Sequence, residues 1–218
     1  VSLVISGCAD PVADLLWPTD RSRRFWIPLI QALGLGIAGV ALLGLTLYLR
    51  SVPGPDSEAL RAHWPLQGRW RVVTAGRHRL TNYHSGRASN QTLAVDFVID
   101  GPRDASLGQP VFAPISGIVV RAVSHLRLGD DPAGGNEVAI QTDEGFLVTL
   151  AHLATDSVLV SEGDRVQAGQ EIAAVGNSGN ADEAHLHIQA ERGGIAIPIL
   201  FGPERHWPLR HQIIDASP

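Results

Sequence analysis

The sequence predicts an antiparallel all-β domain, built as a β-sheet or β-sandwich and preceded by one transmembrane α-helix. The helix is predicted by residues 27–49, which hold no charged side chain across 23 residues. The β domain is predicted from Arg69 onward, where short runs of Val, Ile, Leu and Phe are separated by Gly, Pro, Asn and Asp turns. No amphipathic stretch of helical length interrupts these runs, so we expect a single β class for the domain.

The apolar segment comes first. At a rise of about 1.5 Å per residue, residues 25–49 are long enough to cross the ~30 Å hydrocarbon core of a bilayer. Trp26 and Tyr48 lie near its two ends, where interfacial aromatic side chains are common. Three Arg residues shortly precede the segment and one directly follows it, which predicts a cytoplasmic tail at residues 1–24 and the remaining chain outside. The length and acidity of that tail favour an uncleaved anchor over a signal peptide.

The segments after the helix are predicted from composition. Residues 50–68 contain three prolines and no sustained period, which is typical of a linker. We expect the β domain to occupy residues 69–205 and a C-terminal tail to occupy residues 206–218.

Composition excludes several chemistries. All 17 basic residues are Arg, so no lysine is present to form a Schiff base or to carry a lipoyl or biotinyl group. The net charge of −5, without a basic block, argues against a nucleic-acid partner. The single cysteine, Cys8, excludes an intramolecular disulfide and a cysteine-based zinc cluster. Cys8 ends "ISGC", which is similar to a lipobox, but the apolar run before it is too short, so we do not expect lipidation.

Two histidines two residues apart are the first candidate site. In "HLHIQ", His185 and His187 would lie on the same face of a β-strand, because successive side chains alternate. A polar strand face would also explain this pair. The sharper hypothesis is a metal site, or a general base beside a ligand.

Further His and Asp side chains support a metal site. Asp96 is the one charge on its face of a predicted strand, where an unpaired buried carboxylate would be costly. His152 ends an apolar strand, and His84 lies in a loop or at a strand edge 12 residues before Asp96. Three or four His with one Asp, without Cys, suit a catalytic zinc site that keeps one position open for water.

At this point the chain resembles a known family. "APISGIVVRAV", "LAHL", "EGDRVQAGQEIAAVGNSGN" and "HLHIQ" together are similar to motifs of the LytM/lysostaphin-type zinc metallopeptidases, which cut peptide bonds in bacterial cell walls. The resemblance covers about residues 82–200. It implies a β-rich catalytic domain that binds one Zn²⁺ ion.

The resemblance also implies roles for five residues. His84, Asp96 and His187 would be the metal ligands, and His152 and His185 the catalytic pair beside the metal.

Three departures from the family pattern accompany this assignment. The commonest family form separates its first His and Asp by four residues rather than 12, so His78 is the alternative to His84. Ala184 stands where Pro is usual and Leu150 where Tyr is usual, and both changes could reshape the substrate groove.

The predicted function is a membrane-anchored zinc endopeptidase acting on peptidoglycan cross-links or stem peptides. It would lie in the bacterial inner membrane, with its N-terminus inside and its catalytic domain periplasmic or extracellular; any envelope protein partner is unknown. The alternative is a catalytically silent member of the family that regulates another cell-wall hydrolase. Because all five site positions can be filled, the enzyme is favoured.

Two further hypotheses are weaker. A carrier-like β-barrel is disfavoured by the absence of Lys and the presence of the His pair. A serine hydrolase using Ser178 is disfavoured because no strand–turn–helix surrounds that residue.

Overall fold

The computed structural model describes residues 20–51 and 58–216 of the 218-residue chain. Its contacts divide the chain into two compact units, Val1–Leu49 and Arg50–Pro218, and each is described by itself. Residues 1–19, which include Cys8 and most of the predicted cytoplasmic tail, lie outside the described residues.

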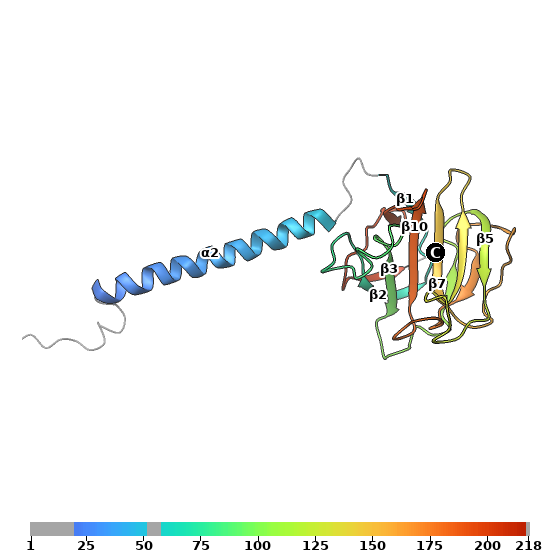
Figure 1. The fold of residues 1–218 in the computed structure, drawn as a ribbon, viewed down its shortest axis with the longest axis horizontal. Helices are drawn as coiled ribbons and strands as arrows, with labels where there is room; N and C mark the ends of the chain where they lie inside the picture. Colours follow the sequence, from blue (N-terminus) through green and yellow to red (C-terminus); the bar gives the residue numbers. More distant parts are fainter. Residues whose placement is uncertain (1–19, 52–57, 217–218) are drawn as a thin grey trace, which may run out of the picture. The chain divides into compact units, whose positions relative to one another are not determined.

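The first unit contains one long helix, α2 (Asp20–Ser51), drawn in blue in Figure 1. It extends beyond the predicted span of residues 25–49 at both ends. Within it, Trp26–Tyr48 has a mean hydropathy of 2.0, and none of its residues is buried by protein. The segment could therefore cross a membrane by length and composition, although a signal sequence near an N-terminus has the same properties.

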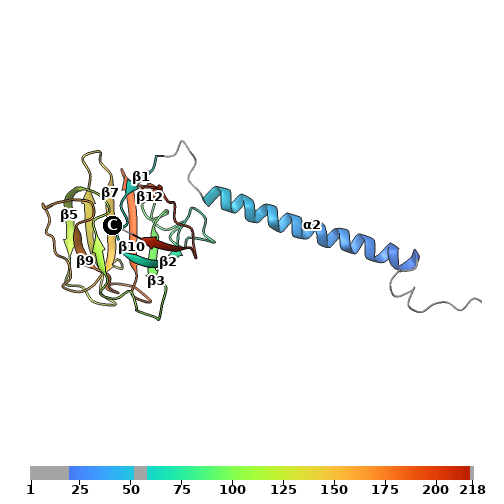
Figure 2. The ribbon, with the colours of Figure 1, turned by 180° about the vertical axis from the view of Figure 1, so that it is seen from behind.

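The second unit consists of β-strands, as predicted. A nine-stranded sheet has the order β13-β2-β3-β10-β7-β6-β5-β8, with β11 paired to β10 (Figures 1 and 2). Two small sheets accompany it, β4-β9 and β1-β12. The strands are β1 (Leu60–Ala62), β2 (Gly68–Thr74), β3 (Val95–Ile99), β4 (Pro110–Phe112), β5 (Gly117–Val123), β6 (Asn136–Gln141), β7 (Leu147–Leu153), β8 (Arg165–Val166), β9 (Glu171–Ala174), β10 (Leu186–Arg192), β11 (Ile195–Ala196), β12 (Ile199–Phe201) and β13 (Ile213–Ala216).

The central strands β3, β10 and β7 separate an apolar core from a polar face. Phe97, Leu150, Leu186 and Ile188 point to one side of the sheet and are completely buried in the core. Because side chains alternate along a strand, the intervening residues of all three strands point to the opposite side. That opposite face holds the polar residues of the site.

The boundaries of the β domain differ from the sequence prediction at both ends. Part of the predicted linker, Leu60–Ala62, forms β1 and pairs in parallel with β12, so the fold is not wholly antiparallel. Trp64, also in the predicted linker, is buried and stacks on Phe201 with ring centroids 4.8 Å apart. Part of the predicted tail, Ile213–Ala216, forms β13 and extends the main sheet beside β2. These strands have only three or four residues, too few to show a period in the sequence.

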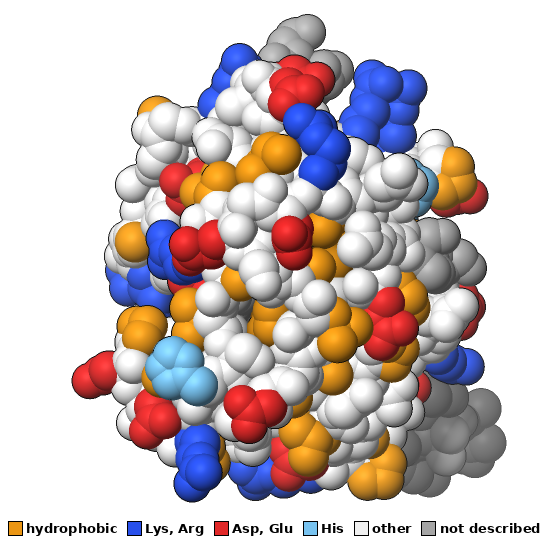
Figure 3. Space-filling model, turned by 90° about the vertical axis from the view of Figure 1, so that its right-hand side faces the viewer, with side chains coloured by type: hydrophobic (Ala, Val, Ile, Leu, Met, Phe, Trp, Pro, Cys, Tyr) orange, Lys and Arg blue, Asp and Glu red, His pale blue; other side chains and the backbone are white. Residues whose placement is uncertain are grey.

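The surface of the β unit carries charges of both signs. On the face shown in Figure 3, acidic and basic side chains are interspersed with small apolar areas, and no continuous basic area is visible there.

Candidate metal centre

Asp96 and His187 face each other across two neighbouring strands. In the antiparallel pairing of β3 with β10, His187 is the direct partner of Asp96, so both side chains leave the same face of the sheet. Both residues are buried, and Nδ1 of His187 lies 2.9 Å from Oδ1 of Asp96. The register of one strand pair thus brings together residues 91 positions apart.

His84 reaches the same point from the loop that joins β2 to β3, residues 75–94. The anchor of this loop is Asn82, whose buried amide nitrogen donates to the carbonyl oxygens of Gly76 and Ala94 at 2.8 and 3.0 Å. The amide oxygen of Asn82 accepts a bond from the backbone N–H of His84 at 3.0 Å. The imidazole of His84 is thereby placed with Nε2 3.0 Å from Oδ2 of Asp96.

His84, Asp96 and His187 form a metal site. One ligand atom from each lies within 4.8 Å of the others, and among the described residues they are the one group of three or more His, Cys, Asp or Glu side chains with this property. His78, the alternative first ligand, is not in the group, and its Nδ1 instead accepts a bond from the backbone N–H of Leu80. Two imidazoles and one carboxylate are the donor set of a single zinc ion with an open position.

The neighbours of these ligands fit a bound cation. Nε2 of His187 lies 3.1 Å from Oε1 of Gln189, and an amide oxygen only accepts, so Nε2 carries the proton and Nδ1 is left for the metal. Burial would raise the pKa of Asp96, but its close contacts with the rings of His187 and His84 hold that pKa well below its usual range. Asp96 is therefore an anion inside the protein, as a metal ligand must be.

Tyr83 adds a further contact to the carboxylate. Its hydroxyl donates to Oδ2 of Asp96, and its ring packs against the imidazole of His84 with centroids 4.2 Å apart. The guanidinium of Arg87 lies 5.8 Å from the centre of the Tyr83 ring. This loop thus places a phenol and a cation at the edge of the metal site.

His152 lies beside the site because of an irregularity in the sheet. In the pairing of β6 with β7, Asn136 is opposite Leu153 while Glu137 is opposite Ala151, so His152 is an extra residue without a partner. Its φ of 58° is left-handed, which non-glycine residues seldom adopt. The bulge turns the imidazole of His152 toward the polar face instead of continuing the strand alternation.

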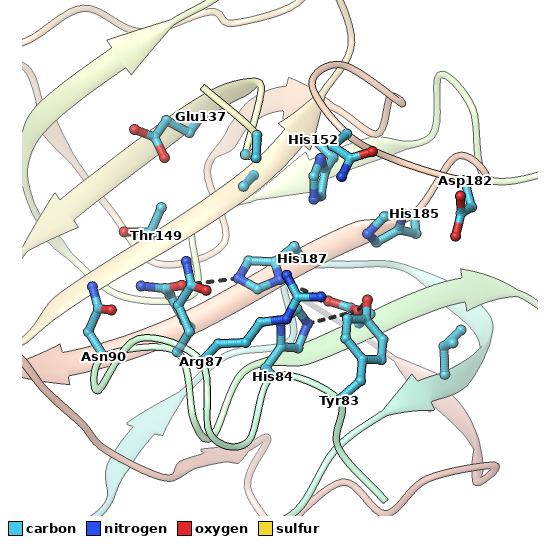
Figure 4. A pocket seen from close by; sticks show the side chains of 18 of the residues that line it. Tyr83, His84, Arg87, Asn90, Glu137, Thr149, His152, Asp182, His185 and His187 are labelled. Carbon is cyan, nitrogen blue, oxygen red and sulfur yellow. Dashed lines mark hydrogen bonds and ion pairs between the residues drawn. The ribbon is translucent and has the colours of Figure 1, made fainter. Parts of the chain in front are cut away.

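Backbone carbonyls fix one ring nitrogen, Nδ1, of His152 and of His185. Nδ1 of His152 lies 2.9 Å from the carbonyl oxygen of Ser178, and Nδ1 of His185 lies 2.8 Å from that of Glu183. A carbonyl oxygen only accepts, so each Nδ1 carries a proton and each ring keeps its Nε2 away from these carbonyls. The two rings are 4.6 Å apart between centroids. Figure 4 shows them together on one side of His187, with His84 and Tyr83 on the other.

The metal site lies in a groove of about 630 Å³ that runs over the polar face of the sheet (Figure 4). Two acidic side chains in the groove have partners. Glu137 forms an ion pair with Arg121 at 2.6 Å, and Glu191 accepts a bond from the amide of Asn90 at 2.6 Å.

The structure corrects one expectation about the departures from the family pattern. Leu150 and Ala184 were expected to reshape the groove, but neither lines it. Leu150 is completely buried in the core on the other side of the sheet. Ala184 is also buried, and its backbone N–H donates to Oδ1 of Asp104 at 2.8 Å.

Several residues of the site were not predicted from the sequence. Asn82, Tyr83 and Gln189 each lie one or two positions from a ligand, which is the only signal that could have found them. Their contacts depend on the folded loop and on the alternation of β10.

The fold and the site define a class of protein, a β-sheet metallohydrolase with a His/Asp/His metal site and two further histidines beside it. Comparison with known families narrows the class, since residues 101–198 match Peptidase family M23. The chain belongs to this family. The matched segment contains His152, His185 and His187, while His84 and Asp96 precede it.

Named relatives come from several bacteria. The chain is 31% identical over 152 residues to "Uncharacterized lipoprotein YgeR" of Escherichia coli, a match that covers 68% of this chain and 54% of the relative. It is 28% identical over 126 residues to "Peptidoglycan DD-endopeptidase ShyA" of Vibrio cholerae, covering 58% of this chain and 26% of the relative. It is 34% identical over 101 residues to "Murein hydrolase activator NlpD" of Escherichia coli, covering 46% and 24%. The chain thus spans about half of the first relative and about a quarter of the other two.

Proposed function

We propose that the chain is a membrane-anchored zinc endopeptidase that hydrolyses peptide bonds of bacterial peptidoglycan. The observation that carries this proposal is the convergence of His84, Asp96 and His187 beside two histidines whose Nδ1 atoms are held by backbone carbonyls. The ShyA relative, named as a peptidoglycan DD-endopeptidase, supports peptidoglycan as the substrate.

The chemistry follows from the donor set and the two neighbouring histidines. A zinc ion held by His84, Asp96 and His187 would supply a Lewis acid that polarises the scissile carbonyl and acidifies water. Burial, with the neighbouring His185 adding to it, lowers the pKa of His152 to about 4, so His152 is neutral at neutral pH.

The protein's own groups then move the proton. Nε2 of His152 accepts a proton from the attacking water as the new carbon–oxygen bond forms. The same ring returns the proton to the leaving amine as the carbon–nitrogen bond breaks. His185, on the same side of the site, stabilises the developing oxyanion.

The N-terminal helix supports an envelope location. Its apolar segment Trp26–Tyr48 suits a membrane anchor, and the relative YgeR is named as a lipoprotein. We place the β unit on the outer side of the cytoplasmic membrane, where peptidoglycan lies.

A second function has one specific observation in its favour. The NlpD relative is named as a murein hydrolase activator, so a regulatory role for this chain is the alternative. The complete His/Asp/His set and its two neighbouring histidines favour the enzyme, because a binding module does not need them.

One experiment separates the two functions. The full-length chain, purified in detergent and loaded with zinc, is incubated with purified peptidoglycan, and the released fragments are identified by mass spectrometry. An endopeptidase releases peptides cut at one defined bond, and the His187→Ala variant releases none. If the chain alone releases nothing but accelerates a second wall hydrolase, the activator function replaces the enzyme.

A further inference from the structure

We infer that Ser178 and Asn136 are positioning residues that hold His152 in its strained conformation with Nε2 directed into the groove. This inference rests on the proposed role of His152 in peptide hydrolysis. It concerns two buried polar residues that neither bind the metal nor line the groove.

The conformation of His152 needs support. A non-glycine residue with φ of 58° costs of the order of 1–3 kcal/mol and persists only where its surroundings hold it. The backbone N–H of His152 donates to the carbonyl oxygen of Gly134 at 2.9 Å, which fixes one side of the bulge. The other side is fixed by Ser178 and Asn136.

Ser178 connects three strands or loops through one side chain. Its hydroxyl donates to the carbonyl oxygen of Leu153 at 2.7 Å and accepts a bond from the backbone N–H of Asn136 at 2.8 Å. Its own carbonyl oxygen receives Nδ1–H of His152 at 2.9 Å. The serine hydroxyl therefore links Leu153, which follows His152, to Asn136, which lies opposite Leu153. The backbone carbonyl of the serine also sets the tautomer of the His152 imidazole.

Asn136 completes the support. It is fully buried, and its amide nitrogen donates to the carbonyl oxygens of Leu126 and Leu153 at 2.8 and 3.1 Å. Its amide oxygen accepts the backbone N–H of Leu126 at 2.8 Å. Both Ser178 and Asn136 thus bind the carbonyl of Leu153, the residue that follows His152.

The packing around Ser178 leaves little freedom. A Cβ placed on Gly135, whose φ is 64°, would lie 2.5 Å from the hydroxyl oxygen of Ser178. This close approach requires glycine at position 135, and it places the serine against the residue that directly precedes β6. The hydroxyl of Ser178 is buried and donates its proton to the carbonyl of Leu153, which argues against the serine-hydrolase hypothesis raised by the sequence.

The test uses the zinc-loaded full-length chain in detergent, as wild type and as Ser178→Ala. The tautomer of His152 is measured by NMR on protein labelled with ¹⁵N-histidine, with the resonance assigned by its loss in His152→Ala. Hydrolysis of soluble cross-linked muropeptides gives kcat and KM. Ser157→Ala is the matched control. The hydroxyl of Ser157 also donates to a backbone carbonyl, that of Ala154 at 2.8 Å, but it has no contact with His152.

We expect wild-type His152 to carry its proton on Nδ1, and Ser178→Ala to show a mixture of tautomers. We also expect kcat to fall about 10- to 100-fold, since small misplacement of a catalytic group has effects of this size. KM and zinc content should stay within about twofold of wild type, and Ser157→Ala should match wild type.

Two results overturn the inference. One is a wild-type His152 protonated on Nε2, which is measured even if Ser178→Ala does not fold. The other is a folded Ser178→Ala with wild-type kcat and tautomer. A wild-type chain that cleaves no muropeptide contradicts the proposed function instead, while the tautomer still tests the positioning.

Discussion

At the scale of single residues, the three histidines on the polar face differ in which ring nitrogen is available. His187 has its Nε2 occupied by Gln189 and offers Nδ1, which points at Asp96. His152 and His185 have their Nδ1 occupied by backbone carbonyls and offer Nε2. We propose that these hydrogen bonds, one for each ring, distinguish the metal ligand from the two catalytic histidines.

This division predicts distinct outcomes for three alanine variants. His187→Ala should lose both zinc and activity, because three protein ligands are near the minimum for tight binding. His152→Ala and His185→Ala should retain about one zinc per chain, while activity falls about 10²–10⁴-fold, through loss of proton transfer in the first variant and of oxyanion stabilisation in the second. Zinc by elemental analysis is compared with peptidoglycan hydrolysis for each variant. Full zinc retention in His187→Ala, or wild-type activity in His185→Ala, would contradict the assignment.

The choice between His84 and His78 gives a second prediction. His84→Ala should lower zinc content strongly, because its Nε2 is one of the three converging ligand atoms. His78→Ala should leave zinc content close to wild type, since the ring of His78 contacts the backbone of its own loop. Elemental analysis after dialysis measures both variants, and the opposite ranking would return His78 to the ligand set.

The sequence predicted which residues form the site better than it predicted the contacts that these residues make. Asp96 could be found as the one charge on a strand face, and His187 through alternation in "HLHIQ". The left-handed conformation of His152 could not be predicted, because it depends on a bulge opposite Asn136 and Glu137, and the sequence alone does not give strand register. The contact between Gln189 and Nε2 of His187 was missed for a similar reason, since it depends on which face of β10 each side chain occupies.

At the scale of elements, the loop between β2 and β3 determines whether the metal site is complete. It contains His84, which precedes Asp96 by 12 residues in the sequence. The side chain of Asn82 holds the loop in place by hydrogen bonds to three backbone carbonyls, those of Gly76, Thr92 and Ala94. The unusual length of this segment is therefore compensated by one buried amide.

We predict that Asn82→Ala weakens zinc binding about 10- to 100-fold, as loss of a supporting contact of a ligand does elsewhere. Ser85→Ala is the control in the same loop, because its hydroxyl bonds the backbone of Arg77 at the surface. Competition with a chromophoric chelator measures the affinity. Unchanged affinity in Asn82→Ala would show that the loop is held by other contacts.

The edges of the β unit were also beyond sequence prediction. β1 and β13 lie in segments whose composition indicated a linker and a tail. β1 is stabilised by pairing with β12, and β13 by pairing with β2, both more than 100 residues away in sequence. Such strands are defined by their partners, so only the longer runs with repeated Val, Ile and Leu were visible beforehand.

At the scale of the whole molecule, a polar groove with a buried metal site belongs to one unit and an apolar helix to the other. Peptidoglycan is a fixed polymer outside the cytoplasmic membrane, so an anchored enzyme is useful only if its β unit is on that side. The orientation of the helix is therefore a condition of the proposed function.

The charge asymmetry around the helix predicts this orientation. Three Arg residues, Arg21, Arg23 and Arg24, precede the apolar segment and Arg50 follows it, so the N-terminus should stay in the cytoplasm. Alkaline phosphatase, which folds to an active form only outside the cytoplasm, should be active when fused after Pro218. Replacing the three preceding Arg residues with Gln should reduce that activity, while replacing Arg50 with Gln should not.

The same fusion distinguishes an anchor from a cleaved signal. An uncleaved helix keeps the fusion in the membrane fraction after an alkaline wash and at its full size on an immunoblot. A shorter, soluble product would mean that the helix is removed, and the enzyme would then act without an anchor. If the phosphatase is inactive while a cytoplasmic reporter fused at the same position is active, the orientation is the reverse of the predicted one. The groove would then lie on the cytoplasmic side, away from peptidoglycan, and this would contradict the proposed function.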